Sequence, residues 1–129
     1  MEAFERITAN GLWPAPRLSG GLEPFSAPGP KEDEVVMCAR WIALHTEPAA
    51  RINRKRTSYG LKHDVERWSK TLSESPFKQV DLHGRSWTAE YFYVSNGAFI
   101  EAAKRAGYRI ARDGEGSPNA HFNMRFKDS

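Results

Sequence analysis

The stretch "NGAFIEAAKRAGYRIARDGEGSPNAHFNMRF", residues 96–126, decides the fold class, because its pattern changes within a few residues from helix to strand. In its first part, apolar side chains recur at helical spacing on one face, namely Phe99, Ala103 and Ala106. Ser95 or Asn96 can cap the start of this helix, and Gly107 is placed to end it. The spacing therefore predicts a helix over 96–106.

The second part of the stretch predicts a β-hairpin over 108–127. The segments "YRIAR" and "AHFNMRF" alternate apolar and polar residues, and "DGEGSPN" between them is rich in turn formers. The alternation puts four apolar side chains on one face: Ala120, Phe122, Met124 and Phe126. The opposite face is expected to carry, as partner contacts or as ordinary exposed polar residues, His121, Asn123, Arg125 and Lys127.

Two earlier segments, 31–46 and 58–70, are also expected to be helices. The first begins with three acids, which suit the positive end of a helix, and carries a wide apolar face that includes Leu44. The second has Thr57 or Ser58 as its cap and an apolar stripe of Leu61, Val65 and Trp68. Three helices followed by a hairpin is the element order of a winged-helix domain. The sequence thus predicts a small α+β single domain that is winged-helix-like, with 96–106 as the groove-entering helix and 108–127 as the wing.

One segment departs from that pattern. Residues 71–94 are much longer than the short turn of a compact helix-turn-helix. We expect a loop here, with one short strand in "FKQVDLHG" and an element of either type in "WTAEYFY".

The first 30 residues differ from the rest of the chain and are expected to form an extended N-terminal arm, leaving 31–129 as the binding domain. Residues 12–30 hold five of the eight prolines, and proline removes amide donors and restricts the backbone. They also hold apolar residues such as Trp13, so we expect the arm to lie on a surface of its own domain or of a partner. A short helix is predicted within 2–9, ending at Asn10-Gly11.

Composition indicates a protein of the cytoplasm. The chain has 129 residues, a net charge of +3 and one cysteine, so no internal disulfide can form. No segment approaches the roughly 20 consecutive apolar residues of a membrane span, and the start does not have the pattern of a signal peptide.

Charge is concentrated in "RINRKRTSYGLKHDVERWSK", residues 51–70, which hold seven Lys and Arg against two acids. The run is either the solvated leader of a helix or a nucleic-acid contact. Its arginine content suits bidentate phosphate binding, and Tyr59 is close enough in sequence to stack on a base or sugar. The expected binding residues for nucleic acid or another partner are Arg51, Arg54, Lys55, Arg56, Tyr59, Lys62, Asn96, Lys104, Arg105, Arg125 and Lys127.

No motif points to catalysis, to a cofactor or to a metal. The four histidines are scattered, Cys38 has no C-x-x-C partner, and no phosphate-binding or dinucleotide fingerprint occurs. Cys38 lies in the predicted apolar helix, so we expect a buried, inert thiol. The prediction is therefore a binding protein and not an enzyme.

Three segments within 56–126, "RTSYGLKHDVERW", "YVSNGAFIEAAKRAGYR" and "PNAHFNMRF", resemble a family of small proteins from bacteria, phages and plasmids. The resemblance implies a setting of mobile elements or host conflict, in which small non-enzymatic proteins bind DNA or block a defence nuclease.

Two functions follow as hypotheses. In the first, the protein binds DNA through the basic run, with helix 96–106 and the hairpin as further contacts. In the second, it is a protein-binding inhibitor of a defence nucleoprotein such as a CRISPR effector, and the arm orders on that partner. No membrane partner is expected. A homodimer stays open, because helix 31–46 has apolar surface to spare.

Overall fold

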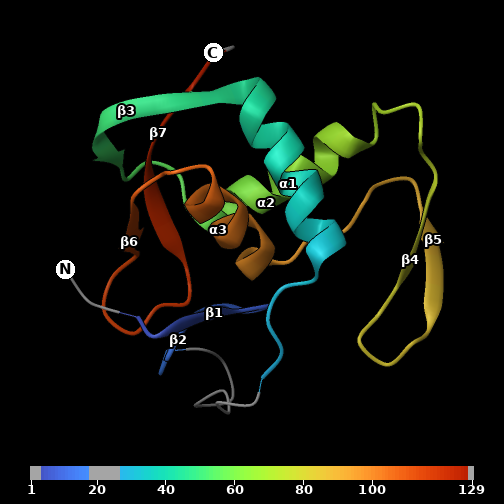
Figure 1. Ribbon diagram of the computed structural model, residues 1–129, viewed down its shortest axis with the longest axis horizontal. Helices are drawn as coiled ribbons and strands as arrows, with labels where there is room; N and C mark the ends of the chain where they lie inside the picture. Colours follow the sequence, from blue (N-terminus) through green and yellow to red (C-terminus); the bar gives the residue numbers. More distant parts are fainter. Residues whose placement is uncertain (1–3, 18–26, 128–129) are drawn as a thin grey trace.

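The computed structural model describes residues 4–17 and 27–127. Within them the chain forms a small α+β domain of three helices and three antiparallel sheets (Figure 1). The elements, in chain order, are β1 Arg6–Thr8, β2 Gly11–Trp13, α1 Glu32–His45, β3 Thr46–Asn53, α2 Ser58–Ser69, β4 Phe77–Val80, β5 Ser86–Ala89, α3 Asn96–Arg105, β6 Ile110–Arg112 and β7 Ala120–Phe126.

The helices predicted over 31–46, 58–70 and 96–106 and the predicted hairpin are confirmed, with ends shifted by at most a few residues. Thr57 caps α2 by accepting the Gly60 amide hydrogen, and Ser95 caps α3 by accepting that of Ala98. Gly107 follows α3 with a φ of 94°, a conformation that favours glycine at the end of a helix. Leu44 does not fit the expected apolar face of α1, because it lies 61% exposed near the end of that helix.

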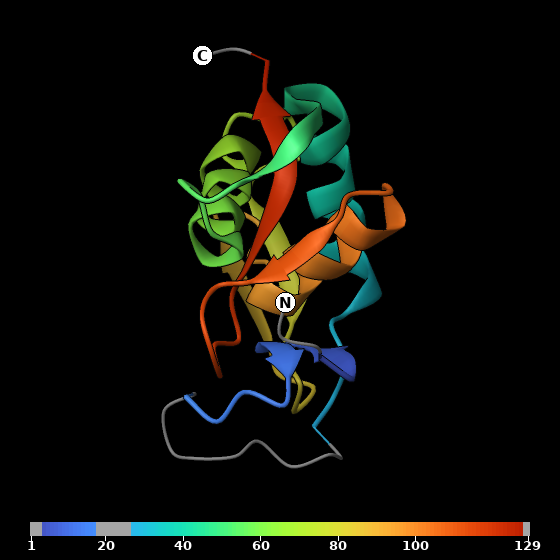
Figure 2. The ribbon, with the colours of Figure 1, turned by 90° about the vertical axis from the view of Figure 1, so that its left-hand side faces the viewer.

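The main sheet has the strand order β3-β7-β6, with β7 in the middle. Strand β3 was not predicted, because "TEPAARIN" has no period-two alternation and contains a proline. It pairs with β7 from Thr46 opposite Phe126 to Asn53 opposite Phe122, and the register shifts between Pro48 and Asn53. Figure 2 shows the outer face of this sheet, with the three helices behind it.

Helix α3 is the centre of the core and not a surface helix. Phe99 is buried between Trp41 of α1, at a ring-centroid distance of 5.9 Å, and Phe122 of β7, at 5.6 Å. The start of α3 is covered by the β1–β2 turn, so closely that a Cβ on Gly97 would lie 1.7 Å from the Thr8 carbonyl oxygen. Nearly every residue of α3 is therefore buried, apart from Lys104 and Arg105 at its last turn.

The N-terminal residues differ from the prediction. No helix forms over the described part of 2–9, where β1 and β2 make a hairpin instead. Leu12 joins the hydrophobic core, and the Leu12 amide donates to the Pro118 carbonyl oxygen at 2.9 Å. Residues 4–17 thus lie on their own domain. The apolar residues Leu18, Leu22 and Phe25 of the predicted arm lie outside the described residues.

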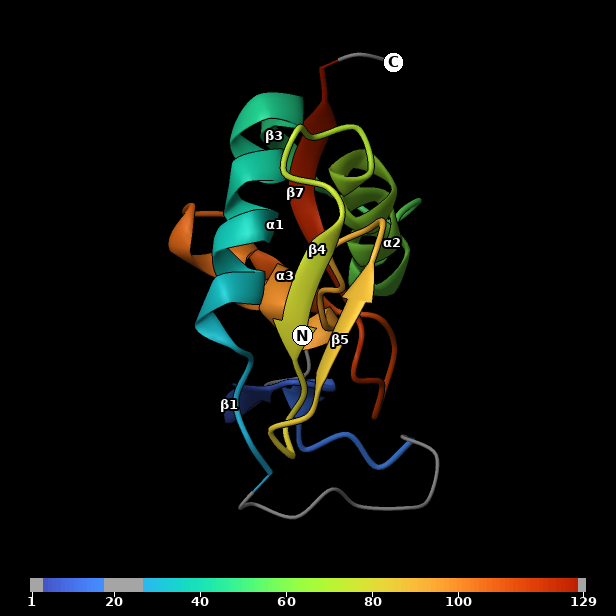
Figure 3. The same ribbon diagram turned by 90° about the vertical axis from the view of Figure 1, so that its right-hand side faces the viewer.

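The long segment 71–94 contains two strands where one was predicted. Strands β4 and β5 pair from Phe77 opposite Ala89 to Val80 opposite Ser86, and they form a hairpin at one side of the helices (Figures 1 and 3). The "WTAEYFY" segment is divided, since its first part is in β5 and its last part crosses back to α3.

Two polar residues of the β6–β7 hairpin, His121 and Arg112, are buried, and for His121 this is contrary to the predicted outward position. The His121 ring lies between the Arg56 carbonyl oxygen, 2.8 Å from Nδ1, and the Asp113 carboxylate, 2.9 Å from Nε2. Arg112 is inward, and its guanidinium donates to the carbonyl oxygens of Pro14 and Ser117. Neither side chain is available to a partner on the sheet surface.

Candidate functional site

Two regions of the molecule have the features of a binding site. The first is a surface of cations at the end of β3 and in the turn to α2. Arg51, Arg54 and Lys55 are exposed there, and none of the ion pairs among the described residues includes them. The Asn53 side chain shapes the turn by accepting the Lys55 amide hydrogen at 3.0 Å.

Arg109 belongs to the same surface although it is far away in sequence. Its guanidinium donates to the Ala50 carbonyl oxygen of β3, next to Arg51. Asn123 reinforces this contact, because its side chain accepts the Arg109 amide hydrogen and donates to the Ala49 carbonyl oxygen. We call this set the basic strip and define it as Arg51, Arg54, Lys55 and Arg109.

The other cations predicted to bind a partner either pair with a carboxylate or lie away from the basic strip. Arg56 pairs with Asp64 and lies over the Phe126 ring, 5.4 Å from its centroid. Arg125 pairs with Glu47 at 2.9 Å, and Lys127 lies at the opposite end of β3 from the turn, where its amide donates to His45.

Lys104 and Arg105 lie on the last turn of α3 and do not join the basic strip. Arg105 is held against the first turn of α1 by Glu32, at 2.8 Å, and on its own helix by Glu101, at 2.9 Å. These two carboxylates raise the pKa of Arg105, and the same contact lowers the pKa of Glu32.

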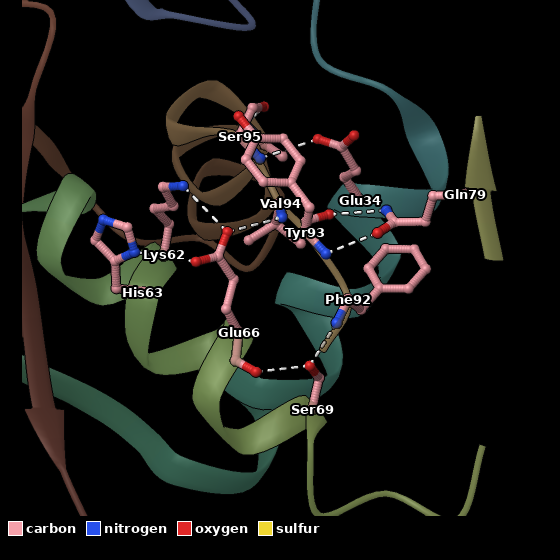
Figure 4. Close-up of polar contacts among 11 residues, drawn as sticks. Glu34, Lys62, His63, Glu66, Ser69, Gln79, Phe92, Tyr93, Val94 and Ser95 are labelled. Carbon is pink, nitrogen blue, oxygen red and sulfur yellow. Dashed lines mark hydrogen bonds and ion pairs between the residues drawn. The ribbon is translucent and has the colours of Figure 1, made fainter. Parts of the chain in front are cut away.

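The second region is built around the segment 92–95, which leads from the β4–β5 hairpin into α3. Four consecutive backbone amides donate to four side chains from three elements (Figure 4). These hydrogen bonds join Phe92 to Ser69 at 2.7 Å, Tyr93 to Gln79 at 2.8 Å, Val94 to Glu66 at 3.3 Å and Ser95 to Glu34 at 2.9 Å. Because every amide in the segment has a partner from another element, the position of Tyr93 is fixed.

Lys62 is part of this network and not of the exposed surface. Its ammonium pairs with Glu66 at 3.1 Å and lies 4.5 Å from the centroid of the Tyr93 ring. The other Glu66 carboxylate oxygen lies 3.0 Å from His63 Nδ1. With only 6% of its surface exposed, Lys62 acts as a buried partner for a carboxylate, contrary to its prediction as a surface contact.

Tyr93 separates two cavities. The larger, of about 510 Å³, which we call the Lys62 cavity, is lined by Ala9, Asn10, Tyr59, Lys62, Tyr93, Asn96, Pro118 and Asn119. The smaller, of about 360 Å³, which we call the Glu34 cavity, is lined by Ala9, Asn10, Lys31, Glu34, Gln79, Val80, Asp81, Leu82, Trp87, Tyr93 and Ser95.

The Glu34 carboxylate is a buried charge without a cation. Glu34 is 5% exposed, and none of the ion pairs among the described residues includes it. Lys31 also lines the cavity, but its ammonium donates to the Val80 carbonyl oxygen. Burial is the main reason that the pKa of Glu34 is raised, and the amide hydrogen bond from Ser95 opposes that shift.

Two more predicted binding residues line the Lys62 cavity. Tyr59, 51% exposed, stands at the first turn of α2 with its ring edge-on to His63. Asn96 is buried, and its amide nitrogen lies within hydrogen-bond distance of Asn10 and Pro118 carbonyl oxygens and of the Asn119 side-chain oxygen. Asn96 thus joins the β1–β2 turn, α3 and the turn before β7.

The three segments that carry the family resemblance meet at the Lys62 cavity. Tyr59 and Lys62 come from the first segment, Tyr93 and Asn96 from the second, and Pro118 and Asn119 from the third. Sequence reasoning missed Glu34, Gln79 and Trp87, because each looks ordinary in its own segment. Only the apolar neighbours of Glu34 in the first turn of α1 gave a signal of burial.

Cys38 is a buried thiol, as predicted, and burial raises its pKa well above the ordinary value.

Among residues 4–17 and 27–127, no three His, Cys, Asp or Glu side chains cluster in a way that could hold a metal ion. No helix in this part of the chain has the length and apolar character to cross a membrane. No family model, curated protein or solved structure matches this chain.

Proposed function

We propose that this protein binds DNA without catalysis, through contacts of the basic strip with phosphate groups. The observation that carries the proposal is that Arg51, Arg54 and Lys55 are exposed next to Arg109 and have no carboxylate partner among the described residues. Elsewhere on the surface, arginines such as Arg56, Arg105 and Arg125 are neutralised by acids. The basic strip is therefore a local concentration of free positive charge.

Free exposed cations favour a polyanion for a physical reason. They pay no cost of breaking an existing ion pair, and each phosphate they neutralise releases condensed counterions from DNA. Arginine can also donate two parallel hydrogen bonds to one phosphate. The three arginines of the strip therefore suit phosphate binding better than lysines would. The strip comes from the end of β3, the adjoining turn and the residue before β6, and Figure 2 shows the backbone of these segments in the β3-β7-β6 sheet.

The winged-helix-like part of the proposal rests on the β6–β7 hairpin. Arg109, immediately before β6, would contact the phosphate backbone of the DNA. Helix α3 contributes little to base recognition in this proposal, because most of its side chains are buried and Arg105 is paired. We therefore expect binding that depends mostly on the phosphate backbone, with limited sequence preference.

The test is fluorescence anisotropy of labelled duplex and single-stranded DNA over a salt series. We expect the triple variant Arg51→Ala, Arg54→Ala, Lys55→Ala to lose most of the affinity and to lower the salt slope by about three counterions. A matched control removes three exposed lysines away from the strip, Lys70→Ala, Lys78→Ala and Lys104→Ala, with the same change of net charge. Absence of binding at low salt, or equal losses in both triple variants, would contradict the proposal.

A second function is favoured by a different observation, the Glu34 cavity with its apolar rim. Val80 and Leu82 on that rim are 47% and 63% exposed. An aromatic and apolar pocket with one buried charge suits a protein partner better than a phosphate backbone. In the mobile-element setting that the family resemblance implies, this function is inhibition of a defence nuclease complex. A pull-down against such complexes tests this function. We expect the complex to capture the triple variant of the basic strip and the unmodified chain to the same extent.

A further inference from the structure

The Glu34 cavity combines a charge with an apolar enclosure. At its floor is the Glu34 carboxylate, and its walls include the Trp87 and Tyr93 rings, whose centroids are 6.5 Å apart at an interplanar angle of 67°. Val80 and Leu82 add exposed aliphatic surface at the rim. The volume of about 360 Å³ lies within the range of pockets that hold small ligand groups.

We propose that the Glu34 cavity binds a basic side chain, lysine or arginine, presented by a protein partner. This inference does not rest on DNA binding, because none of the residues of the basic strip lines the cavity.

The carboxylate determines the sign of the ligand's charge. A buried carboxylate without a cation is costly, because it has lost water and has gained only hydrogen bonds. The Ser95 amide supplies one such bond at 2.9 Å, and the nearby Lys31 ammonium is directed to the Val80 carbonyl oxygen. A cation that reaches Glu34 therefore restores an interaction that the folded chain leaves incomplete.

The walls determine the shape of the ligand. Lysine and arginine carry their charge at the end of an apolar stem, and such a stem can pack along Val80, Leu82 and Trp87 while the charged end reaches the carboxylate. The aromatic faces of Trp87 and Tyr93 add attraction for a cation within about 6 Å of a ring. A bare metal ion would find only Glu34 and Asp81 as carboxylate ligands, and Asp81 already pairs with Arg85, so the ligand set is poor.

The surroundings favour a basic partner as well. Asp33, next to Glu34 in the first turn of α1, is exposed and has no ion pair among the described residues, whereas Asp81, which lines the same cavity, already pairs with Arg85 at 3.1 Å. The Asp33 carboxylate would attract a positively charged peptide and repel nucleic acid. The cavity is thus suited to a positively charged protein segment, which the cations of the basic strip would repel.

The experiment uses the full chain and three capped tripeptides, Ac-Gly-X-Gly-NH2, with lysine, arginine or norleucine at X. Norleucine has an aliphatic stem without the charge. Binding is followed by NMR through the Trp87 indole signal, which the Trp87→Phe variant assigns. We expect the lysine or the arginine peptide to shift this signal with a Kd on the order of 1 mM, and norleucine to bind at least about 10-fold more weakly.

The decisive variant is Glu34→Gln, which keeps an oxygen for the Ser95 amide and removes the charge. We expect it to weaken binding of the preferred peptide by about 10-fold or more, while the control Glu90→Gln, an equal change of charge on an exposed residue that does not line the cavity, changes it less than about 2-fold. Circular dichroism melting confirms that each variant is folded. If Glu34→Gln does not fold, Leu82→Lys replaces it, because it adds a competing positive charge at an exposed lining residue and keeps the Trp87 signal.

Three results would overturn the inference: norleucine binding as tightly as the charged peptides, unchanged affinity in the folded Glu34→Gln variant or in its replacement Leu82→Lys, or no change of the Trp87 signal at saturating peptide. All three leave the anisotropy test of DNA binding untouched. The two proposals can therefore fail independently.

Discussion

The basic strip and the segment 92–95 hold charge in opposite ways. In the basic strip, Arg51, Arg54 and Lys55 lie on the surface and take part in no ion pair among the described residues. Around the segment 92–95, Glu34, Glu66 and Lys62 are buried. Every backbone amide of the segment donates to a side chain of another element. One region has charge available for a ligand, and the other uses most of its charge to hold the chain in place.

This contrast teaches which substitutions should change stability and which should change binding. Removing an exposed cation loses little free energy of folding, since water replaces its interactions. Removing one member of the buried network leaves the others desolvated and unpaired. Glu34 stands between the two cases, because it is buried like Glu66 but takes part in no ion pair among the described residues.

The largest effect is expected for Glu66→Ala. The substitution leaves the Lys62 ammonium buried without its carboxylate and removes the acceptors of the Val94 amide and of His63. We expect the free energy of unfolding to fall by about 3–5 kcal/mol, measured by urea denaturation. Glu66→Gln keeps one acceptor oxygen and should cost less. A loss below about 1 kcal/mol for Glu66→Ala would mean that the network does not support the fold.

A slightly smaller loss is expected for Gly97→Ala. The new Cβ would meet the Thr8 carbonyl oxygen, a backbone atom that cannot move without displacing the β1–β2 turn from α3. We expect a cost of about 1–3 kcal/mol in the same denaturation experiment. The control is Gly60→Ala on α2, where the nearest atom to a Cβ is 3.7 Å away and helix propensity favours alanine. Equal stability of the two variants would show that the β1–β2 turn is not packed on α3 as described.

An intermediate effect, dependent on pH, is expected for Glu34→Gln. Because folding raises the pKa of Glu34, the folded chain binds this proton more tightly than the unfolded chain does, and the resulting stability is lost as pH rises through the folded pKa. The free energy of unfolding of Glu34→Gln relative to the unmodified chain should therefore increase from pH 4 towards pH 7. Denaturation at several pH values measures this, and Asp33→Asn serves as the exposed comparison. A constant difference across the range would contradict the prediction.

The smallest effect on stability is expected in the basic strip. Arg54→Ala should change the free energy of unfolding by no more than about 0.5 kcal/mol, because the side chain is exposed and has no ion pair among the described residues. The same substitution should lower the salt slope of DNA binding by about one counterion. A large loss of stability together with unchanged binding would reverse the roles that the comparison assigns to the two regions.

Much of the secondary structure could be predicted, because the signals are local. The helices have apolar stripes and caps, such as Ser95 for α3, and β6–β7 has clear alternation around a turn-rich loop. Strand β3 could not be predicted, because its pairing with β7 outweighs a weak local pattern. Strand β1 lies in the segment predicted as a short helix, and most of β2 lies in the predicted extended arm. A strand of three residues is too short for its alternation to be recognised in the sequence.

The candidate sites divide along the same line. Arg51, Arg54 and Lys55 could be selected from the sequence, because a run of cations is visible in any fold. Lys62 and Asn96 were selected for surface contact, yet both are buried, since neighbours from distant segments cover them. Arg109 joins the basic strip only through its contact with Ala50, which is 59 positions earlier in the chain.

The sequence by itself determined the three helices, the β6–β7 hairpin and the concentration of positive charge before α2. These depend on residues close together in the chain, whose spacing expresses helix and strand geometry directly. Only the tertiary structure decided that α3 is central, that Glu66 neutralises Lys62 and that Glu34, Trp87 and Tyr93 line one cavity. Those relations join α1, α2, the β4–β5 hairpin and the segment before α3, and burial and pairing across such distances leave no periodic trace in the sequence.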